Sequence, residues 1–184
     1  LQGLGLSPKF LSLLKSMFSK ITRCVRVNGS LTEDFPVHVG VPQGSVLSPA
    51  LYALYIDGLH RALRDAGLGV WVFGQLVPLL LYADDIVLLA PTPIQLHAML
   101  QVLETYASRW RFDINHGKNK IVVSGAASSA VKRATRLERW RVAGGVLYTV
   151  DSYKYLGLDF GPIKRGMWNT TLNRMIKKAK RCLN

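Results

Sequence analysis

Residues 80–90 read Leu-Leu-Tyr-Ala-Asp-Asp-Ile-Val-Leu-Leu-Ala, which places two adjacent carboxylates inside a run of strand-forming apolar residues. Such a run is typical of a strand in the interior of a sheet, where two ionised carboxylates are very costly to bury. The cost falls if Asp84 and Asp85 lie at a turn that reaches solvent, or if they bind a cation. Carboxylate oxygens are hard ligands that select Mg²⁺ or Mn²⁺. From the residues alone, a metal site and a plain turn are equally good interpretations.

A second stretch, residues 40–49, reads Gly-Val-Pro-Gln-Gly-Ser-Val-Leu-Ser-Pro. Its two glycines let the backbone approach a ligand closely, and the amide of Gln43 lies between them, where it can contact a base or a sugar. The same pattern is also that of an ordinary connection from a strand to a capped helix. Physical chemistry alone favours this simpler interpretation.

Apolar residues at helical spacing predict three helices, which begin at the capping signals Ser7-Pro8, Ser48-Pro49 and Thr92-Pro93. We expect the first to end near Ile21, the second near Gly67 and the third near Trp110. Thr92 and Gln95 fit a capping box. A further basic amphipathic helix is expected from Trp168 to Ala179.

Strand signals lie between these helices. The pair Asn28-Gly29 predicts a β-hairpin, and residues 70–73 and 79–90 predict a second hairpin or sheet pair. Short strands are expected at residues 121–124, 146–150 and 154–158, with a loop at 125–130. Helices and short strands mix without strict alternation, which predicts an α+β fold with helices covering one face of a mainly antiparallel sheet.

Composition and charge narrow the class of protein. The chain has 184 residues, 49% of them hydrophobic, and a net charge of +13, which fits one folded domain and excludes a disordered basic tail. Residues 107–184 hold the whole positive excess, so we expect a polyanion as partner. Nucleic acid is a better candidate for this partner than an anionic membrane surface. The alternative is a basic face that is simply solvated. Cys24 and Cys182 are expected to be thiols in a reducing compartment rather than a bridge or a zinc site. Asp84 and Asp85 exclude a membrane span at residues 76–91.

Taken together, residues 40–49 and 82–90 resemble the template-contacting loop and the metal-binding turn of reverse transcriptases, specifically those of non-LTR (LINE-type) retrotransposons. Residues 114–120, Ile-Asn-His-Gly-Lys-Asn-Lys, resemble the Asn-x-x-Lys element of that family. Residues 153–158, Tyr-Lys-Tyr-Leu-Gly-Leu, resemble its primer-grip hairpin. The resemblance covers nearly the whole chain and is weakest between residues 125 and 147. Asn119 departs from the pattern, since the family usually has Thr there.

The resemblance implies a polymerase palm, an antiparallel sheet covered by helices, with the start of a thumb. Residues 1–125 would be a partial reverse transcriptase palm, residues 126–160 its continuation with the primer-grip-like hairpin, and residues 161–184 a basic helix at the start of the thumb. The implied partners are an RNA template, a DNA primer and deoxynucleoside triphosphates, with no membrane. Nuclear action is implied by the family only.

The resemblance also assigns roles to individual residues. Asp84 would be the principal ligand of Mg²⁺ (or Mn²⁺) and Asp85 the supporting one, with two metal ions acting in nucleotidyl transfer. Lys118 would lie near the triphosphate as a charge stabiliser or proton donor, although a solvated loop lysine is the simpler alternative. The remaining implied contacts are Pro42, Gln43, Gly44 and Tyr82 for nucleotide and template, and Tyr155, Leu156 and Gly157 for the primer. Ordinary core packing is the alternative for Tyr155 and Leu156.

The family supplies a further catalytic aspartate from a strand before the first helix, together with a fingers region. Residues 1–6 contain no acidic side chain. We therefore expect this chain to be inactive by itself and to need the missing N-terminal part of its parent protein. The alternative hypothesis is a degenerate retroelement remnant that keeps only non-specific nucleic-acid binding.

Overall fold

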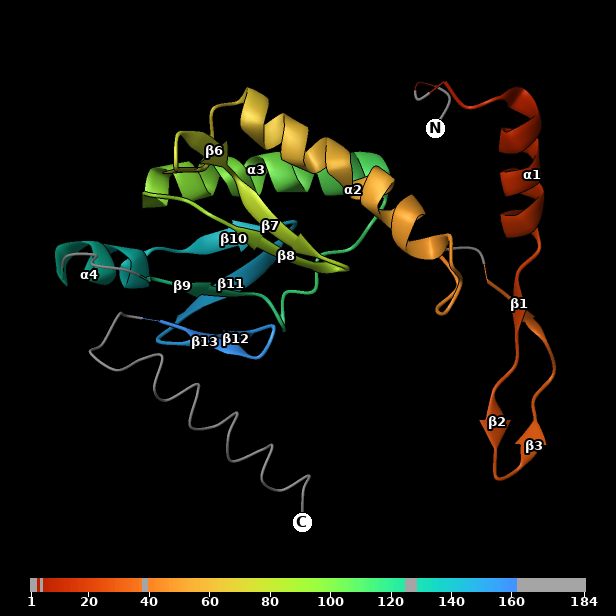
Figure 1. The fold of residues 1–184 in the computed structure, drawn as a ribbon. Helices are drawn as coiled ribbons and strands as arrows, with labels where there is room; N and C mark the ends of the chain where they lie inside the picture. Colours follow the sequence, from red (N-terminus) through yellow and green to blue (C-terminus); the bar gives the residue numbers. More distant parts are fainter. Residues whose placement is uncertain (1–2, 4, 38–39, 125–128, 162–184) are drawn as a thin grey trace, which may run out of the picture. The chain divides into compact units, whose positions relative to one another are not determined.

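The computed structural model describes residues 3, 5–37, 40–124 and 129–161, and these residues form two compact units. The first unit comprises Leu1–Ala62 and Leu79–Val87, and the second comprises Leu63–Pro78 and the described residues from Leu88 onward. Each unit is described by itself. The elements are labelled in Figure 1.

The first unit begins with helix α1, Pro8–Ser19. The side chain of Ser7 accepts a hydrogen bond from the Phe10 amide, so the predicted cap is confirmed. Four short strands follow: β1 (Thr22–Arg23) pairs with β4 (Phe35–Pro36), and β2 (Arg26–Val27) pairs with β3 (Ser30–Leu31). The turn between β2 and β3 is Asn28-Gly29, as predicted.

Helix α2 (Ser48–Asp65) and the hairpin of β7 (Leu79–Tyr82) and β8 (Asp85–Leu88) provide most of the remainder of the first unit. The predicted capping role of Ser48 is wrong, because its hydroxyl donates to the Pro42 carbonyl oxygen at 2.7 Å and does not cap the helix. That bond closes the loop before α2.

The second unit contains a hairpin of β5 (Val70–Val72) and β6 (Gln75–Val77). The predicted pairing of residues 70–73 with residues 79–90 is therefore wrong, because the turn Phe73-Gly74 folds β5 onto its immediate neighbour. Two separate hairpins replace the single expected pair.

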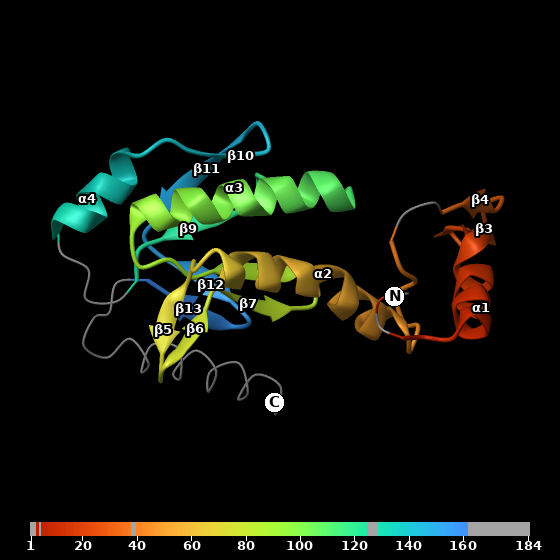
Figure 2. The same cartoon turned by 90° about the horizontal axis from the view of Figure 1, so that it is seen from above.

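Helix α3, Pro93–Trp110, lies across one face of a three-stranded sheet (Figures 1 and 2). The sheet has the order β10 (Trp140–Val142), β11 (Gly145–Val150), β9 (Lys120–Val122); β10 and β11 are antiparallel, whereas β11 and β9 are parallel. The core of the unit is the apolar face of α3 against the sheet, and its buried residues are Met99, Leu100, Leu103, Tyr106, Ala107, Ile121, Trp140, Val142 and Leu147.

The capping box at the start of α3 is half formed. Thr92 accepts a hydrogen bond from the Gln95 amide at 3.2 Å, as predicted. The Oε1 atom of Gln95 is buried without a hydrogen-bond partner, so it does not return a bond to the cap.

Helix α4 (Ser129–Leu137) precedes β10, and the hairpin of β12 (Tyr153–Tyr155) and β13 (Leu158–Phe160) ends the described chain. Residues 154–158 are thus not one strand, as periodicity predicted, but contain the turn Leu156-Gly157. The predicted helix at residues 168–179, which the resemblance makes the start of a thumb, lies outside the described residues. None of the helices in the described ranges is long and apolar enough to cross a membrane.

Candidate functional site

Asp84 and Asp85 lie at the tip of the β7–β8 hairpin. Ala83 and Asp84 form the two-residue turn, and Asp85 is the first residue of β8. Both carboxylates are exposed, and the neighbouring Tyr82 side chain is 62% exposed. Because water reaches the turn, Asp84 and Asp85 do not incur the desolvation cost expected for carboxylates inside a sheet. Both carboxylates are therefore available to a ligand.

The conformation of this turn separates it from the other hairpins of the described chain. In four hairpins a residue with positive φ is followed by a glycine with positive φ: Asn28-Gly29, Phe73-Gly74, Ala143-Gly144 and Leu156-Gly157. In the β7–β8 hairpin the first turn residue, Ala83, has a φ of +50°, but an aspartate takes the place of the glycine. A left-handed alanine costs about 1–2 kcal/mol. The hairpin thus presents a carboxylate at the position that glycine occupies in the other four turns, and the strained residue is Ala83 rather than Asp84.

The donor chemistry of the pair fits a divalent cation of the magnesium type. Mg²⁺ usually binds proteins through one or two carboxylates and completes its shell with water and substrate phosphates. Among the described residues, no group of three or more His, Cys, Asp or Glu side chains is arranged to hold a metal ion. Asp84 and Asp85 therefore fit an ion that shares its shell with a substrate.

Two tyrosines of α2 belong to the same unit as the carboxylate turn. The rings of Tyr52 and Tyr55 lie 6.2 Å apart between centroids and are tilted by 41°. Burial, then the negative charge of Asp84, then Tyr55 raise the pKa of Tyr52. Burial raises the pKa of Tyr55 as well. Tyr52 is therefore a neutral phenol within electrostatic reach of Asp84. The sequence did not predict this relationship.

The loop before α2 contains a tight turn with Gln43 and Gly44 at its centre. The Ser45 amide donates to the Pro42 carbonyl oxygen at 3.3 Å, and Gly44 has a φ of +86°. A positive φ at the third position of such a turn favours glycine, which explains Gly44. Ser48, only 7% exposed, holds the same Pro42 oxygen from the helix. The loop is thus fixed at its base, while Gln43 and Gly44 are exposed.

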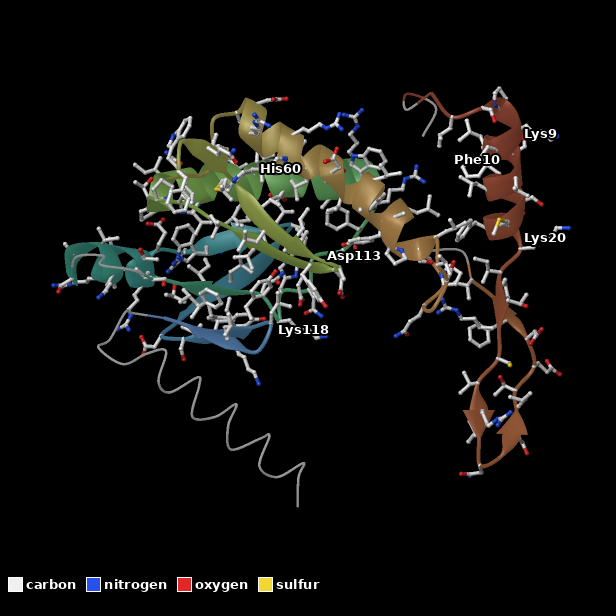
Figure 3. All side chains as sticks on the ribbon, viewed as in Figure 1. Lys9, Phe10, Lys20, His60, Asp113 and Lys118 are labelled. Atoms are coloured by element: carbon white, nitrogen blue, oxygen red, sulfur yellow. The ribbon has the colours of Figure 1, made fainter. Side chains whose placement is uncertain are left out.

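Lys118 lies on the segment between α3 and β9 (Figure 3). The side chain of Lys118 is exposed, whereas its main-chain amide and carbonyl oxygen each have a hydrogen-bond partner. The Lys118 amide lies 3.2 Å from the Asn115 side-chain oxygen, and the hydroxyl of Tyr153 lies 3.5 Å from the Lys118 carbonyl oxygen. The second of these contacts joins the segment to β12.

The three residues predicted for the primer lie at the β12–β13 turn. Tyr155 ends β12, is half-buried, and meets the Phe160 ring edge-on at 6.2 Å between centroids. Leu156 is exposed and has a φ of +48°, and Gly157 follows it with a φ of +84°. Tyr155 thus has a packing role within the hairpin, and Leu156 projects from its tip.

The predicted site residues fall into two groups. Pro42, Gln43, Gly44, Tyr82, Asp84 and Asp85 belong to the first unit, and Lys118, Tyr155, Leu156 and Gly157 belong to the second. Within the second unit, the contact of Tyr153 with Lys118 brings the Lys118 segment next to the β12–β13 hairpin. Besides Tyr52, the sequence missed the contact of Ser48 with Pro42 and that of His116 with Val142, because each forms only in the folded chain.

Residues 4–160 match the family described as Reverse transcriptase (RNA-dependent DNA polymerase), so this chain belongs to the reverse transcriptase family. A retrovirus-related Pol polyprotein from the type-1 retrotransposable element R2 of Popillia japonica is 30% identical over 88% of the chain. The RNA-directed DNA polymerase from the mobile element jockey of Drosophila funebris is 29% identical over 83%.

A third relative is the transposon TX1 uncharacterized 149 kDa protein of Xenopus laevis, which is 33% identical over 68% of the chain. The matched regions cover 23% of the Popillia protein, 16% of the jockey protein and 10% of the TX1 protein. The chain therefore spans no more than about a quarter of the length of these relatives, all of which come from non-LTR elements. The predicted family is confirmed.

Proposed function

We propose that this chain carries the metal-binding turn and the nucleotide pocket of an RNA-directed DNA polymerase that copies a retrotransposon RNA. The observation that carries the proposal is the exposed carboxylate pair at the β7–β8 turn, where Asp84 takes the position that glycine occupies in the other described hairpin turns. Membership of the reverse transcriptase family supports it. The reaction would join a deoxynucleoside triphosphate to a DNA primer on an RNA template.

Asp84 and Asp85 would hold the divalent metal, Mg²⁺ or Mn²⁺, with Asp84 as the principal ligand. When bound in a two-metal site, such ions make the primer hydroxyl more acidic and offset the charge on the leaving pyrophosphate. Tyr52 would keep a neutral hydroxyl near Asp84, because burial and the aspartate charge both oppose its ionisation. The phenol would therefore add no second negative charge at the site.

Pro42, Gln43, Gly44 and Tyr82 would surround the nucleotide and the template. Gly44 allows the backbone to approach a ligand closely, and Gln43 offers both an amide donor and a carbonyl acceptor. The fixed base of the loop supports this role, because Ser48 and Ser45 both bond the Pro42 carbonyl oxygen. Tyr82 presents an exposed ring beside the carboxylates.

Lys118 would stabilise charge on the triphosphate or donate a proton to the leaving group. Tyr155, Leu156 and Gly157 would position the primer end, with Leu156 as the exposed contact. The relatives are much longer than this chain, so extension would require the polypeptide that surrounds it in its reading frame. The nucleus would be the place of action.

The test is primer extension on an RNA template, with the chain alone and with the complete reading frame that encodes it. We expect Asp84→Asn to reduce extension by the complete protein by at least about 100-fold, since removing one charge-stabilising group in an active site costs that much. Asp85→Asn should weaken extension and raise the Mg²⁺ requirement. Asp65→Asn, at an exposed carboxylate of α2, is the matched control. Full extension by Asp84→Asn would refute the proposal.

A second candidate function is nucleic-acid binding without catalysis. The net charge of +13, all of it held by residues 107–184, favours this function. It predicts binding that weakens steeply with salt and does not respond to Mg²⁺ or to Asp84→Asn. The two functions are separated by the metal dependence of extension in the same assay.

A further inference from the structure

His116 makes a specific contact that neither the metal site nor the nucleotide pocket uses. Its Nε2 atom lies 2.8 Å from the main-chain carbonyl oxygen of Val142, at the end of β10. A carbonyl oxygen only accepts, so Nε2 is the nitrogen that carries the proton. We infer that His116 is a positioning residue, which locks residues 115–120, here called the Lys118 loop, against the β10–β11 hairpin so that Lys118 is held ready for phosphate. The inference rests on the proposed role of Lys118.

The Lys118 loop is held in shape by hydrogen bonds to its first residue, Asn115. The amides of Lys118 and Asn119 both donate to the Asn115 carbonyl oxygen, at 3.3 and 3.2 Å. The Asn115 side chain accepts a second contact from the Lys118 amide at 3.2 Å. Asparagine stabilises such turns by bonding the backbone that follows it. The loop is therefore a closed turn, but these local bonds do not fix it to the remainder of the unit.

His116 and two other side chains supply that attachment. The Lys120 ammonium donates to the Gly117 carbonyl oxygen at 3.0 Å and lies 5.4 Å from the centre of the Tyr148 ring on β11. The Tyr153 hydroxyl reaches the Lys118 carbonyl oxygen from β12, at the long distance of 3.5 Å. Lys120, at the end of the loop, is also the first residue of β9 and pairs with Tyr148 of β11, so this end of the loop is part of the sheet. Of the side-chain ties, the His116 bond is the shortest and the only one from the loop to a main-chain group of the described sheet. It is therefore the bond on which we expect the attachment to depend most.

Gly145 shows how closely the imidazole is fitted. A Cβ atom at Gly145 would collide with three ring atoms of His116. Gly145 does not have the positive φ that favours glycine, so its backbone would accept alanine. Space for the His116 ring is thus the physical reason for glycine at the start of β11.

The attachment would lower the entropy that Lys118 loses when its side chain binds phosphate. A lysine on a loose loop loses backbone freedom when it binds phosphate, whereas a lysine on a fixed turn loses mainly side-chain freedom. The ammonium of Lys118 has no hydrogen bond or ion pair among the contacts made by the described residues. The structure thus fixes the backbone of the lysine and leaves its charge available.

The attachment is tested first without any assay of function, by amide hydrogen exchange on the 184-residue chain. We expect His116→Ala to reduce the protection of the Lys118 and Asn119 amides by roughly fivefold to tenfold, the loss expected for one hydrogen bond. His116→Gln, which keeps a donor, should restore part of that protection. His60→Ala on α2 is the matched histidine control. Unchanged protection in His116→Ala would overturn the inference.

A double-mutant cycle tests the fit independently. Gly145→Ala alone should loosen the Lys118 loop, because the new methyl group displaces the His116 ring. In a His116→Ala background the same change should have little effect, because the ring is gone. Equal effects of Gly145→Ala in the two backgrounds would contradict the close contact. Near-ultraviolet circular dichroism of each variant establishes that the unit remains folded.

Binding of inorganic triphosphate then separates the inference from the proposed function. We expect Lys118→Ala and His116→Ala each to weaken binding by roughly fivefold, with His116→Gln closer to the natural chain. Lys154→Ala, at an exposed lysine of β12, controls for general attraction to a basic chain. If Lys118→Ala weakens binding no more than Lys154→Ala, the proposed role of Lys118 fails, whereas the exchange experiment alone decides whether His116 holds the loop.

Discussion

The imidazole of His97 lies flat against the indole of Trp140, with 4.3 Å between the ring centroids and an interplanar angle of 18°. His97 belongs to α3, and Trp140 begins β10, so the stack joins the helix to the sheet. Trp140 is 1% exposed, and its Nε1 atom donates to the Thr135 carbonyl oxygen at 2.9 Å. His97 also pairs with Glu138, with 3.2 Å between nitrogen and oxygen.

The stack should contribute more to stability than the contact between His97 and Glu138, because both of those side chains are substantially exposed. We expect His97→Ala to lower the free energy of unfolding by about 1–2 kcal/mol. His97→Phe, which keeps a flat ring, should recover most of that loss. Glu138→Gln should cost less than about 1 kcal/mol. Urea denaturation followed by tryptophan fluorescence measures all three, and a larger loss in Glu138→Gln than in His97→Ala would contradict this order.

Ala83 gives a prediction that connects backbone strain with function. Its φ of +50° favours glycine, so Ala83→Gly should raise the free energy of unfolding by about 0.5–1 kcal/mol, after the greater freedom of glycine in the unfolded chain is included. Ala143→Gly is the matched control, since Ala143 has a φ of +46° in a different hairpin. Thermal or urea unfolding measures both changes.

The two variants should differ in activity. If the β7–β8 turn orients Asp84, the added freedom in Ala83→Gly should reduce primer extension by the complete protein, whereas Ala143→Gly, which does not alter that turn, should reduce extension less. Equal activity in the two variants would show that the conformation of Ala83 serves the hairpin alone.

Tyr52 provides a prediction about pH. Burial and, second, the charge of Asp84 raise its pKa above the ordinary value of 10.0. The folded chain therefore holds the phenol proton more tightly than the unfolded chain does. The resulting stability is fully present below pH 10 and is lost as the pH rises through the higher pKa of the folded state. Tyr52→Phe should weaken this alkaline loss of stability.

Asp84→Asn removes the charge of Asp84 but leaves Tyr52 buried. The pKa of Tyr52 should therefore be lower than in the natural chain but still above its ordinary value. Tyr55 is the internal control, because burial alone raises its pKa. Nuclear magnetic resonance of ring-labelled tyrosine follows both titrations. A titration of Tyr52 that does not move in Asp84→Asn would show that the two side chains do not interact.

Local signals in the sequence were sufficient for α1, α2, α3 and one hairpin, whereas helix α4 (Ser129–Leu137) was not predicted. Ser7 and Thr92 cap helices through bonds to residues three positions away, and Asn28-Gly29 forms a turn by itself, so neighbouring residues determine the outcome. The turn Phe73-Gly74 was missed, because the bulky first residue hid the turn within an apolar run. The strand pattern missed Leu156-Gly157 in the same way, and only the family resemblance implied a hairpin there. The parallel pairing of β11 with β9 was not predictable, since it depends on how distant segments pack.

The candidate site divides in the same way. The adjacent carboxylates and the Gln43-Gly44 turn are visible in the sequence, because each is a continuous stretch. The contact of His116 with Val142 and the electrostatic reach of Asp84 to Tyr52 are not visible, because each joins residues that only the fold brings together. In the sequence, His116 is one of several polar residues in a loop. No neighbouring residue indicates that its ring lies against Gly145.

The basic side chains of α4 are expected to contact nucleic acid. Arg133 is exposed and forms no salt bridge within the described residues, whereas Arg136 is paired with Asp151. A free arginine that neutralises a phosphate releases counterions, so it adds about 0.7–0.9 to the slope of log affinity against log salt. An arginine already paired with a carboxylate must give up that partner to do the same.

We therefore expect Arg133→Ala to reduce the slope of log affinity against log salt by about 0.7–0.9, the contribution of one phosphate contact. Arg136→Ala should reduce this slope by less. Arg61→Ala is the control, because Arg61 pairs with Asp57 at 2.6 Å on α2, in the part of the chain with little net charge. Fluorescence anisotropy with a labelled oligonucleotide over a range of salt concentrations measures each slope. A loss of slope in Arg61→Ala as large as that in Arg133→Ala would mean that the general charge of the chain, rather than the α4 surface, attracts nucleic acid.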